Sequence, residues 1–338
     1  MAAARARRAS VFVKPRHLRS GDTVAVVAPA GPVPVGRLQQ GIATLERLGF
    51  DVRLGAGVLS QERFFAGPDS TRALDLVSLW ARRDVAAVFC ARGGYGTARI
   101  VDALTPAFLR RHPKIFCGFS DITTLHAACA RAGLVSFYGP MVAWDLAHGP
   151  ARVPRSRSAA LKLATATQIS RSGGFDEASF RAMLMDGVSS YAIAPAAAEP
   201  LVRGRASGRL LGGCLSLLVA TIGTPEELDT RGSILVLEDE KEPPYRVDRM
   251  LTQLRRAGKF DGVRGIVLGD FPECDPAPGS GYALVDVLRD RLGDLGVPVA
   301  WRFPVGHTLQ PNVTLPLGVK ATLDAGRGRL VIAESPVR

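Results

Sequence analysis

Apolar and polar residues alternate along the first half of the chain in blocks that predict strands and helices in turn. Residues 23–28 form a continuous apolar run, which suits a strand buried on both faces of a sheet. Residues 35–48 follow with apolar positions at helical spacing and stop at Gly49. The alternation continues and predicts strands at 50–54, 86–90 and 115–119 and helices at 70–83, 98–104 and from 121 onward. Short connections between such elements favour an α/β fold with a doubly wound parallel sheet.

The second half of the chain restarts this pattern after a stretch that contains several prolines. Residues 151–200 are interpreted as a linker or crossover with one helix at 175–186. We therefore expect a basic tail at 1–13, an N-terminal α/β domain at 14–150, the linker, and a second α/β domain at 201–335. In the second domain the pattern predicts helices at 211–222, 246–257 and 282–292, strands at 233–237, 265–268 and 297–301, and a hairpin of 319–323 with 329–332.

Composition is that of an ordinary folded protein, and 338 residues suit two domains. The longest apolar stretch, 210–223, contains three glycines and is too short to span a bilayer. Residues 1–10 contain arginines without the apolar segment of a secretory signal. The five cysteines are an odd number without metal-type spacing, which predicts free thiols in a reducing cytoplasm. We expect no metal, no cofactor and no membrane partner.

The formal net charge of +12 raises the possibility of nucleic-acid binding. Much of the excess lies at 5–19, 152–157 and 203–209, which are interpreted as a tail and connecting segments. Aromatic residues do not alternate with the basic ones, as a binder of single strands would need. We therefore expect no nucleic-acid partner, although a basic surface could attract small anionic substrates.

Ser120 lies where the predicted strand 115–119 passes into a helix. A strand-to-helix turn exposes a hydroxyl and directs backbone N–H groups and the positive helix end toward it. These are the requirements of a nucleophilic serine, which needs donors for the oxyanion formed after attack. An N-capping serine would suit the same position equally well.

A serine nucleophile needs a base and an acid that orients the base. Of the five histidines, His307 follows the predicted strand 297–301 and lies on a loop at a strand end. Glu238 follows the apolar run 234–237, at the end of a predicted buried strand. A carboxylate at that position loses its solvation and must find a partner. Asp239 and Glu240 are competing candidates. The histidine could instead be held by backbone, and the acidic residues could form a solvated loop.

The loop after strand 86–90 reads Arg92-Gly93-Gly94-Tyr95-Gly96 and would meet Ser120 at the carboxyl edge of a parallel sheet. Gly93 or Gly94 could supply one oxyanion donor, and the N–H of Asp121 could supply the other. Arg92 is the candidate for binding a substrate carboxylate by charge and location, and it could equally be a structural ion-pair partner.

Several separated segments together resemble the LD-carboxypeptidase family of serine peptidases, which also contains microcin-immunity-type peptidases. The resemblance covers the chain from about Lys14 to Glu334. It rests on residues 20–29, 91–96, 118–123, 237–239, 243–251, 306–307 and 315–318. The resemblance implies a Ser, Glu, His triad at Ser120, Glu238 and His307, a site between the two domains, and a cytoplasmic homodimer.

The resemblance also implies a substrate, a murein tetrapeptide that loses its terminal D-alanine. Cys214, where asparagine is common in the family, and Thr308, where glycine is common, depart from the expected pattern. Both could alter the choice of substrate. The alternatives are a microcin-immunity-type peptidase that cleaves peptidyl-nucleotide amides, and a non-catalytic protein that binds small anions without forming an acyl-serine.

Overall fold

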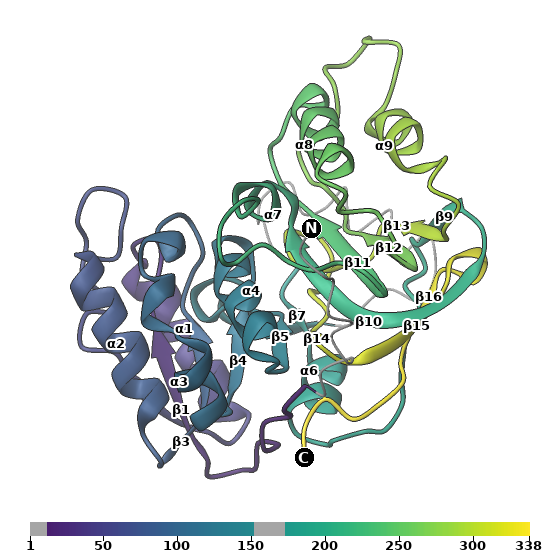
Figure 1. Ribbon diagram of the computed structural model, residues 1–338. Helices are drawn as coiled ribbons and strands as arrows, with labels where there is room; N and C mark the ends of the chain where they lie inside the picture. The colour runs from purple at the N-terminus through teal and green to yellow at the C-terminus, as the bar shows by residue number, and fades with distance from the viewer. Residues whose placement is uncertain (1–11, 152–172) are drawn as a thin grey trace, which may run out of the picture.

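The computed structural model describes residues 12–151 and 173–338, whose backbone forms two large sheets with helices packed on them (Figure 1). Residues 1–11 of the expected basic tail and 152–172 of the expected linker lie outside the described residues. None of the helices in the described part combines the length and hydropathy that a membrane span requires.

The first sheet has six strands in the order β14-β5-β4-β3-β1-β2. Strands β1 to β5 are parallel to their neighbours, and β14 pairs antiparallel with β5. Their bounds are β1 Thr23–Val27, β2 Asp51–Leu54, β3 Val85–Cys90, β4 Ile115–Gly118, β5 Ser136–Tyr138 and β14 Leu315–Leu317. The order 2-1-3-4-5 is that of a doubly wound sheet, so the predicted fold class is confirmed.

The helices of this part of the fold follow the sequence pattern closely. They are α1 Val35–Arg47, α2 Asp69–Ala81, α3 Pro106–Arg111 and α4 Thr123–Ala132. In α1 the buried residues Leu38 and Leu45 form the inner face, and the chain turns away at Gly49, whose φ is +97°. A π-helical segment, Val142–Leu146, packs beside α1.

The second sheet has eight strands in the order β8-β16-β15-β10-β11-β12-β13-β9. Its centre, β10 to β13, is parallel, and the outer strands pair antiparallel. The strands are β8 Tyr191–Ile193, β9 Glu199–Val202, β10 Arg205–Cys214, β11 Ser233–Glu238, β12 Gly265–Leu268, β13 Val299–Trp301, β15 Lys320–Asp324 and β16 Arg329–Ile332. Helices α7 Leu215–Ala220, α8 Pro244–Arg256 and α9 Leu284–Leu292 belong to this half of the molecule (Figure 1). The pairing of β15 with β16 confirms the predicted hairpin.

Two helices predicted from the sequence are wrong. Residues 211–222 are not one helix, because β10 extends to Cys214 and only Leu215–Ala220 is helical. The strand continues there because β10 pairs with β11 and β15, which are distant in sequence. Residues 98–104 form two 3₁₀ turns, Thr97–Arg99 and Val101–Ala103, rather than an α-helix.

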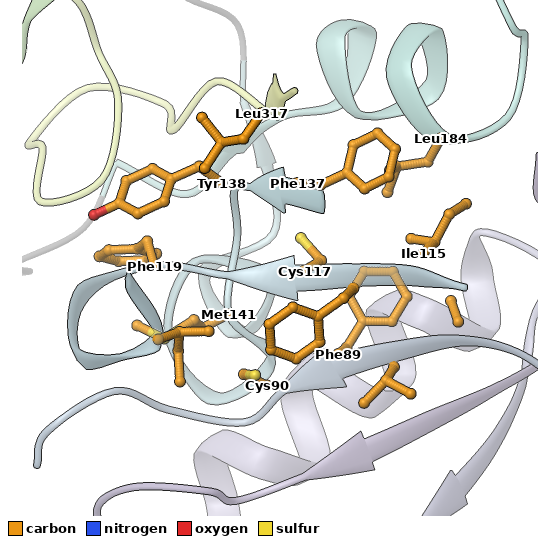
Figure 2. Packing of buried hydrophobic residues seen from close by; sticks show 14 of the residues in the cluster. Phe89, Cys90, Ile115, Cys117, Phe119, Phe137, Tyr138, Met141, Leu184 and Leu317 are labelled. Carbon is orange, nitrogen blue, oxygen red and sulfur yellow. The ribbon is translucent and has the colours of Figure 1, made fainter. Parts of the chain in front are cut away.

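The core of the first sheet contains side chains from later in the chain. Helix α6, Glu177–Leu184, and the short strand pair of β6 Pro150–Ala151 with β7 Phe175–Asp176 connect the two halves. Leu184 of α6 and Leu317 of β14 belong to the same apolar cluster as Cys117 of β4 and Phe137 of β5, and Figure 2 labels all four residues. The two halves therefore share one continuous apolar core on this side.

Candidate active site

Ser120 occupies a strained turn directly after β4. Its φ is +65°, in the left-handed region that residues other than glycine adopt uncommonly. A 3₁₀ turn, Ser120–Ile122, leads from it into α4. The backbone N–H of Ser120 donates to the hydroxyl of Tyr138 at 3.3 Å. Strain of this kind is concentrated at functional sites, where the surrounding structure holds it in place.

The glycine loop after β3 lies directly against Ser120. A Cβ atom on Gly93 would lie 2.8 Å from the Cβ of Ser120 and 3.0 Å from its Oγ, so the position requires glycine. The carbonyl of Gly93 accepts from the N–H of Gly31 at 3.0 Å, and Gly94 has a φ of +118°. The structure therefore brings the loop and the serine turn together at the carboxyl ends of β3 and β4.

Asp121 fixes this loop to the start of the helix. Its Oδ2 accepts from the N–H of Thr97 at 2.9 Å, and its carbonyl oxygen accepts from the Thr97 hydroxyl at 2.6 Å. The side chain is 1% exposed, and burial raises the pKa of its carboxyl group. The expected role of Asp121 was a backbone donor, and the anchoring role of its side chain was not anticipated.

Glu238 and His307 form a hydrogen-bonded pair at the ends of two parallel strands. Glu238 is the last residue of β11 and is fully buried, and His307 lies on the loop after β13. Glu238 Oε2 accepts from both the Nδ1 and the backbone N–H of His307 at 2.8 Å each. This bond assigns the proton of the neutral ring to Nδ1 and leaves Nε2 as the basic nitrogen.

Three carboxylates determine the charge of His307. Burial lowers its pKa, but Glu238, Glu240 and Asp239 together raise it to about 9. Glu240 Oε1 lies 3.5 Å from Nε2. Asp239 instead accepts from the N–H of Ser216 at 2.8 Å, and burial with the nearby Glu238 raises its pKa to about 6. Of the three acidic candidates, Glu238 is the one bonded to Nδ1.

Cys214, at the end of β10, lies beside this pair. Its sulfur, a Glu238 oxygen and a His307 nitrogen lie within 4.8 Å of one another, which is a possible metal-ligand set that spacing along the chain did not reveal. Burial raises the pKa of the Cys214 thiol well above its usual range, which opposes the thiolate that a metal binds. Glu238 Oε2 and His307 Nδ1 are already hydrogen-bonded to each other.

The residue after the histidine braces its loop. The Thr308 hydroxyl donates to the half-buried carboxylate of Asp270 and accepts from the N–H of Gln310 at 3.0 Å. Threonine at this position therefore adds one hydrogen bond within the histidine loop and one to Asp270, which follows β12.

Arg92 and the remaining histidines have other partners. The half-buried Arg92 donates to the carbonyl of Pro32 at 2.8 Å and has no carboxylate within ion-pair distance among residues 12–151 and 173–338. His126 is buried between Gly118 and Ser136, and burial lowers its pKa to about 4, so it is a packed neutral histidine. His148 bonds to Arg37 and the carbonyl of Trp144.

The two halves of the molecule meet at these groups. The ring of Phe119, beside Ser120, lies 5.1 Å from that of His307 in an edge-to-face arrangement. The N–H of Cys214 donates to the Thr123 hydroxyl at the start of α4 at 3.0 Å. Tyr138 was not among the predicted site residues, although its hydroxyl bonds to Ser120 in one half and to Glu238 in the other. The available signal was its place in the apolar strand 136–138, since a buried tyrosine hydroxyl usually has a hydrogen-bond partner.

Comparison with known proteins identifies the family. Models of the N-terminal and C-terminal domains of LD-carboxypeptidases match residues 24–139 and 207–323. A probable murein peptide carboxypeptidase of Bacillus subtilis is 37% identical, with 96% of this chain and 95% of that protein covered. The chain belongs to the LD-carboxypeptidase family.

Two further proteins are similar to this member of the LD-carboxypeptidase family, one named as a carboxypeptidase and one as a microcin self-immunity protein. The crystal structure of muramoyltetrapeptide carboxypeptidase from Oxalobacter formigenes is 31% identical, with a TM-score of 0.74 and coverage of 93% of this chain and 100% of that chain. The microcin C7 self-immunity protein MccF of Escherichia coli is 28% identical, with 94% of each protein covered. A solved MccF complex with glutamyl sulfamoyl guanosine has a TM-score of 0.83 at 25% identity, covering 96% of this chain and 99% of that chain.

Proposed function

We propose that this chain is a serine-type LD-carboxypeptidase that removes the terminal D-alanine from murein tetrapeptide during cell-wall recycling. The observation that carries the proposal is the pair of Glu238 and His307, hydrogen-bonded at 2.8 Å and packed against Phe119, the residue that precedes the strained Ser120. Family membership and the names of the murein peptide relatives support the same reaction.

In this mechanism His307 Nε2 takes the proton of Ser120, and Oγ attacks the scissile carbonyl carbon. Glu238 accepts the hydrogen bond from Nδ1–H of His307. This bond keeps the proton on Nδ1 and Nε2 basic, and the carboxylate stabilises the imidazolium that forms. His307 then protonates the leaving amine of D-alanine. A water molecule, deprotonated by His307, hydrolyses the acyl-serine and restores the free enzyme.

The tetrahedral oxyanion needs two donors in this scheme. The N–H of Ser120 already donates to Tyr138, which favours the N–H of Asp121 together with that of Gly93 or Gly94. Gly93 lies against Ser120, and the Asp121 side chain fixes the same loop through Thr97. Loss of one such donor costs about 10²–10³ in rate.

An enzyme that removes one terminal residue must recognise a free carboxylate, and we assign this role to Arg92. Its guanidinium donates to Pro32 with Nη1 at 2.8 Å, which fixes the side chain beside the glycine loop and leaves other N–H groups free to bind.

The decisive experiment is incubation of the purified protein with L-Ala-γ-D-Glu-meso-diaminopimelyl-D-Ala, followed by mass spectrometry. Wild type should release one alanine, and Ser120→Ala should fold normally and release none. Full activity in Ser120→Ala would end the serine-peptidase proposal. Arg92→Gln, run alongside, should raise KM with little change in kcat.

The second candidate function is cleavage of a peptidyl-nucleotide amide, favoured by the end-to-end similarity to MccF. The acyl-serine chemistry would be the same. If wild type leaves the tetrapeptide intact, aspartyl and glutamyl sulfamoyl nucleosides become the next probes. Binding without any acyl-serine from either class would favour a non-catalytic protein.

The proposal also includes a cytoplasmic location and a homodimeric state, as the family resemblance implies. Light scattering coupled to gel filtration tests the dimer, and a single species at 35.9 kDa, the mass of one chain, would refute it.

A further inference from the structure

The hydroxyl of Tyr138 makes hydrogen bonds to both halves of the candidate site. It accepts from the backbone N–H of Ser120 at 3.3 Å, and it donates to Oε1 of Glu238. Figure 2 shows the ring at the edge of the apolar cluster, with the hydroxyl turned away from Phe137. A hydroxyl placed for packing alone would not need two polar partners from different sheets.

The strand pairing determines where this side chain lies. Tyr138 is the last residue of β5, opposite Gly118 of β4 on one side and Leu315 of β14 on the other. The residue is fully buried. Its position is therefore tied to the strand that ends just before Ser120.

The direction of each hydrogen bond follows from the chemistry of the partners. A backbone N–H only donates and an ionised carboxylate only accepts, so the Tyr138 proton lies toward Glu238. Burial and the nearby Glu238 charge raise the pKa of Tyr138 well above its usual range, so the hydroxyl keeps its proton wherever the enzyme works.

Both oxygens of Glu238 are consequently occupied by different groups. Oε2 accepts twice from His307, and Oε1 accepts from Tyr138. Two separate anchors fix the plane of the carboxylate and therefore the orientation of the imidazole bonded to it. The other titratable groups near the pair are Asp239 and Glu240 beyond the end of β11 and the thiol of Cys214 at the end of β10.

We propose that Tyr138 is a positioning residue that aligns the Ser120 turn of the first sheet with the Glu238–His307 pair of the second. The hydroxyl is hydrogen-bonded to the N–H of Ser120 and to Oε1 of Glu238 at the same time. It acts through these residues and does not touch the reacting atoms. The proposal rests on the proposed serine mechanism.

The test is Tyr138→Phe, which keeps the ring and removes the hydroxyl. We expect kcat for D-alanine release to fall about tenfold or more with little change in KM, because a buried acceptor and a buried donor lose their partner. The matched control is Tyr191→Phe, which removes the hydroxyl of a half-buried tyrosine in β8. This control should keep wild-type kcat.

A second readout separates this proposal from the proposed function, because it needs no substrate. The imidazole of His307 is titrated by NMR in wild type and Tyr138→Phe, with its signals assigned from a His307→Asn spectrum. Without the Tyr138 donor, Glu238 attracts the His307 proton more strongly, so the midpoint should rise by about half a pH unit or more. An unchanged or lower midpoint would overturn the proposal even if kcat fell, because Tyr138 would then be only a packing residue.

A third variant keeps the proposal testable if Tyr138→Phe fails to fold. Site-specific 3-fluorotyrosine at 138 retains the hydroxyl and makes it a stronger donor, since fluorine lowers the phenol pKa. The His307 midpoint should then move to lower pH, opposite to the phenylalanine variant. A midpoint equal to wild type would contradict the proposal. Failure of the tetrapeptide assay in all proteins, with these NMR shifts present, would count against the substrate alone.

Discussion

Gly306 allows Glu238 to lie directly beneath the histidine loop. Its φ is +69°, and a Cβ atom there would lie 2.4 Å from Cδ of Glu238. Gly306→Ala should therefore displace the carboxylate, and a misplacement of about 1 Å can cost about 10²-fold in rate. Measuring kcat/KM for D-alanine release checks this expectation.

The chain offers a closely matched control for this substitution. Gly296 has the same φ of +69°, and a Cβ atom there would meet nothing within 4 Å. Gly296→Ala should cost about 1–2 kcal/mol of stability from its backbone conformation and leave activity unchanged. Equal activities in the two variants would show that space beside Glu238 is not what Gly306 provides.

The pKa of His307 predicts an alkaline activity profile. A general base must be neutral, and the neighbouring carboxylates raise this pKa to about 9, so kcat/KM should rise about tenfold per pH unit up to that region. Stability has the opposite sign. A raised pKa stabilises the fold fully below the unfolded value of about 6.5, and this contribution is lost as pH rises through about 9.

Glu240→Gln tests the origin of this profile. Removing the charge that lies 3.5 Å from Nε2 should lower the pKa of His307 and move the activity midpoint to lower pH. The control is Glu46→Gln, which removes an exposed carboxylate on α1 and should leave the activity midpoint unchanged. Identical profiles for the two variants would mean that Glu240 does not act on the histidine.

At the scale of elements, the local sequence pattern predicted correctly those strands that are buried on both faces. Strands β1, β3 and β4 are buried along nearly their whole length, and each appears in the sequence as a continuous apolar run. The pattern misled at β10, because an apolar run with glycines fits a strand or a buried helix equally well. The pairing that decides it comes from β11 and β15.

The candidate site likewise combines features that the local sequence indicates with features that depend on partners distant in sequence. Ser120, Glu238 and His307 could be predicted because each follows a predicted strand, where side chains of parallel sheets converge. The partners of the Tyr138 hydroxyl could not be predicted, since they lie 18 and 100 residues away and a hydroxyl bond leaves no periodic trace. The anchoring role of Asp121 was missed for a similar reason, because its partner Thr97 lies in a loop 24 residues earlier.

At the scale of the whole molecule, the first sheet depends on the rest of the chain. Phe175, Phe180, Leu184 and Leu317 all join its core from beyond residue 151. Each such side chain contributes about 2 kcal/mol when buried, so the four together contribute about 8 kcal/mol. That is comparable with the total stability of a typical domain, about 5–15 kcal/mol.

A fragment of residues 1–151 should therefore fail to fold cooperatively, although it contains β1 to β5 and the Ser120 turn. Circular dichroism during thermal unfolding should give a broad, weak transition for the fragment and a sharp one for the full chain. Co-expression with residues 152–338 should restore both the sharp transition and D-alanine release, because the second fragment supplies β14, α6, Glu238 and His307. The last residue of the chain supports this interdependence, since the Arg338 N–H donates to the Pro15 carbonyl at 2.9 Å. A sharp transition in the isolated fragment would mean that β5 tolerates an open edge and that the half containing Ser120 folds by itself.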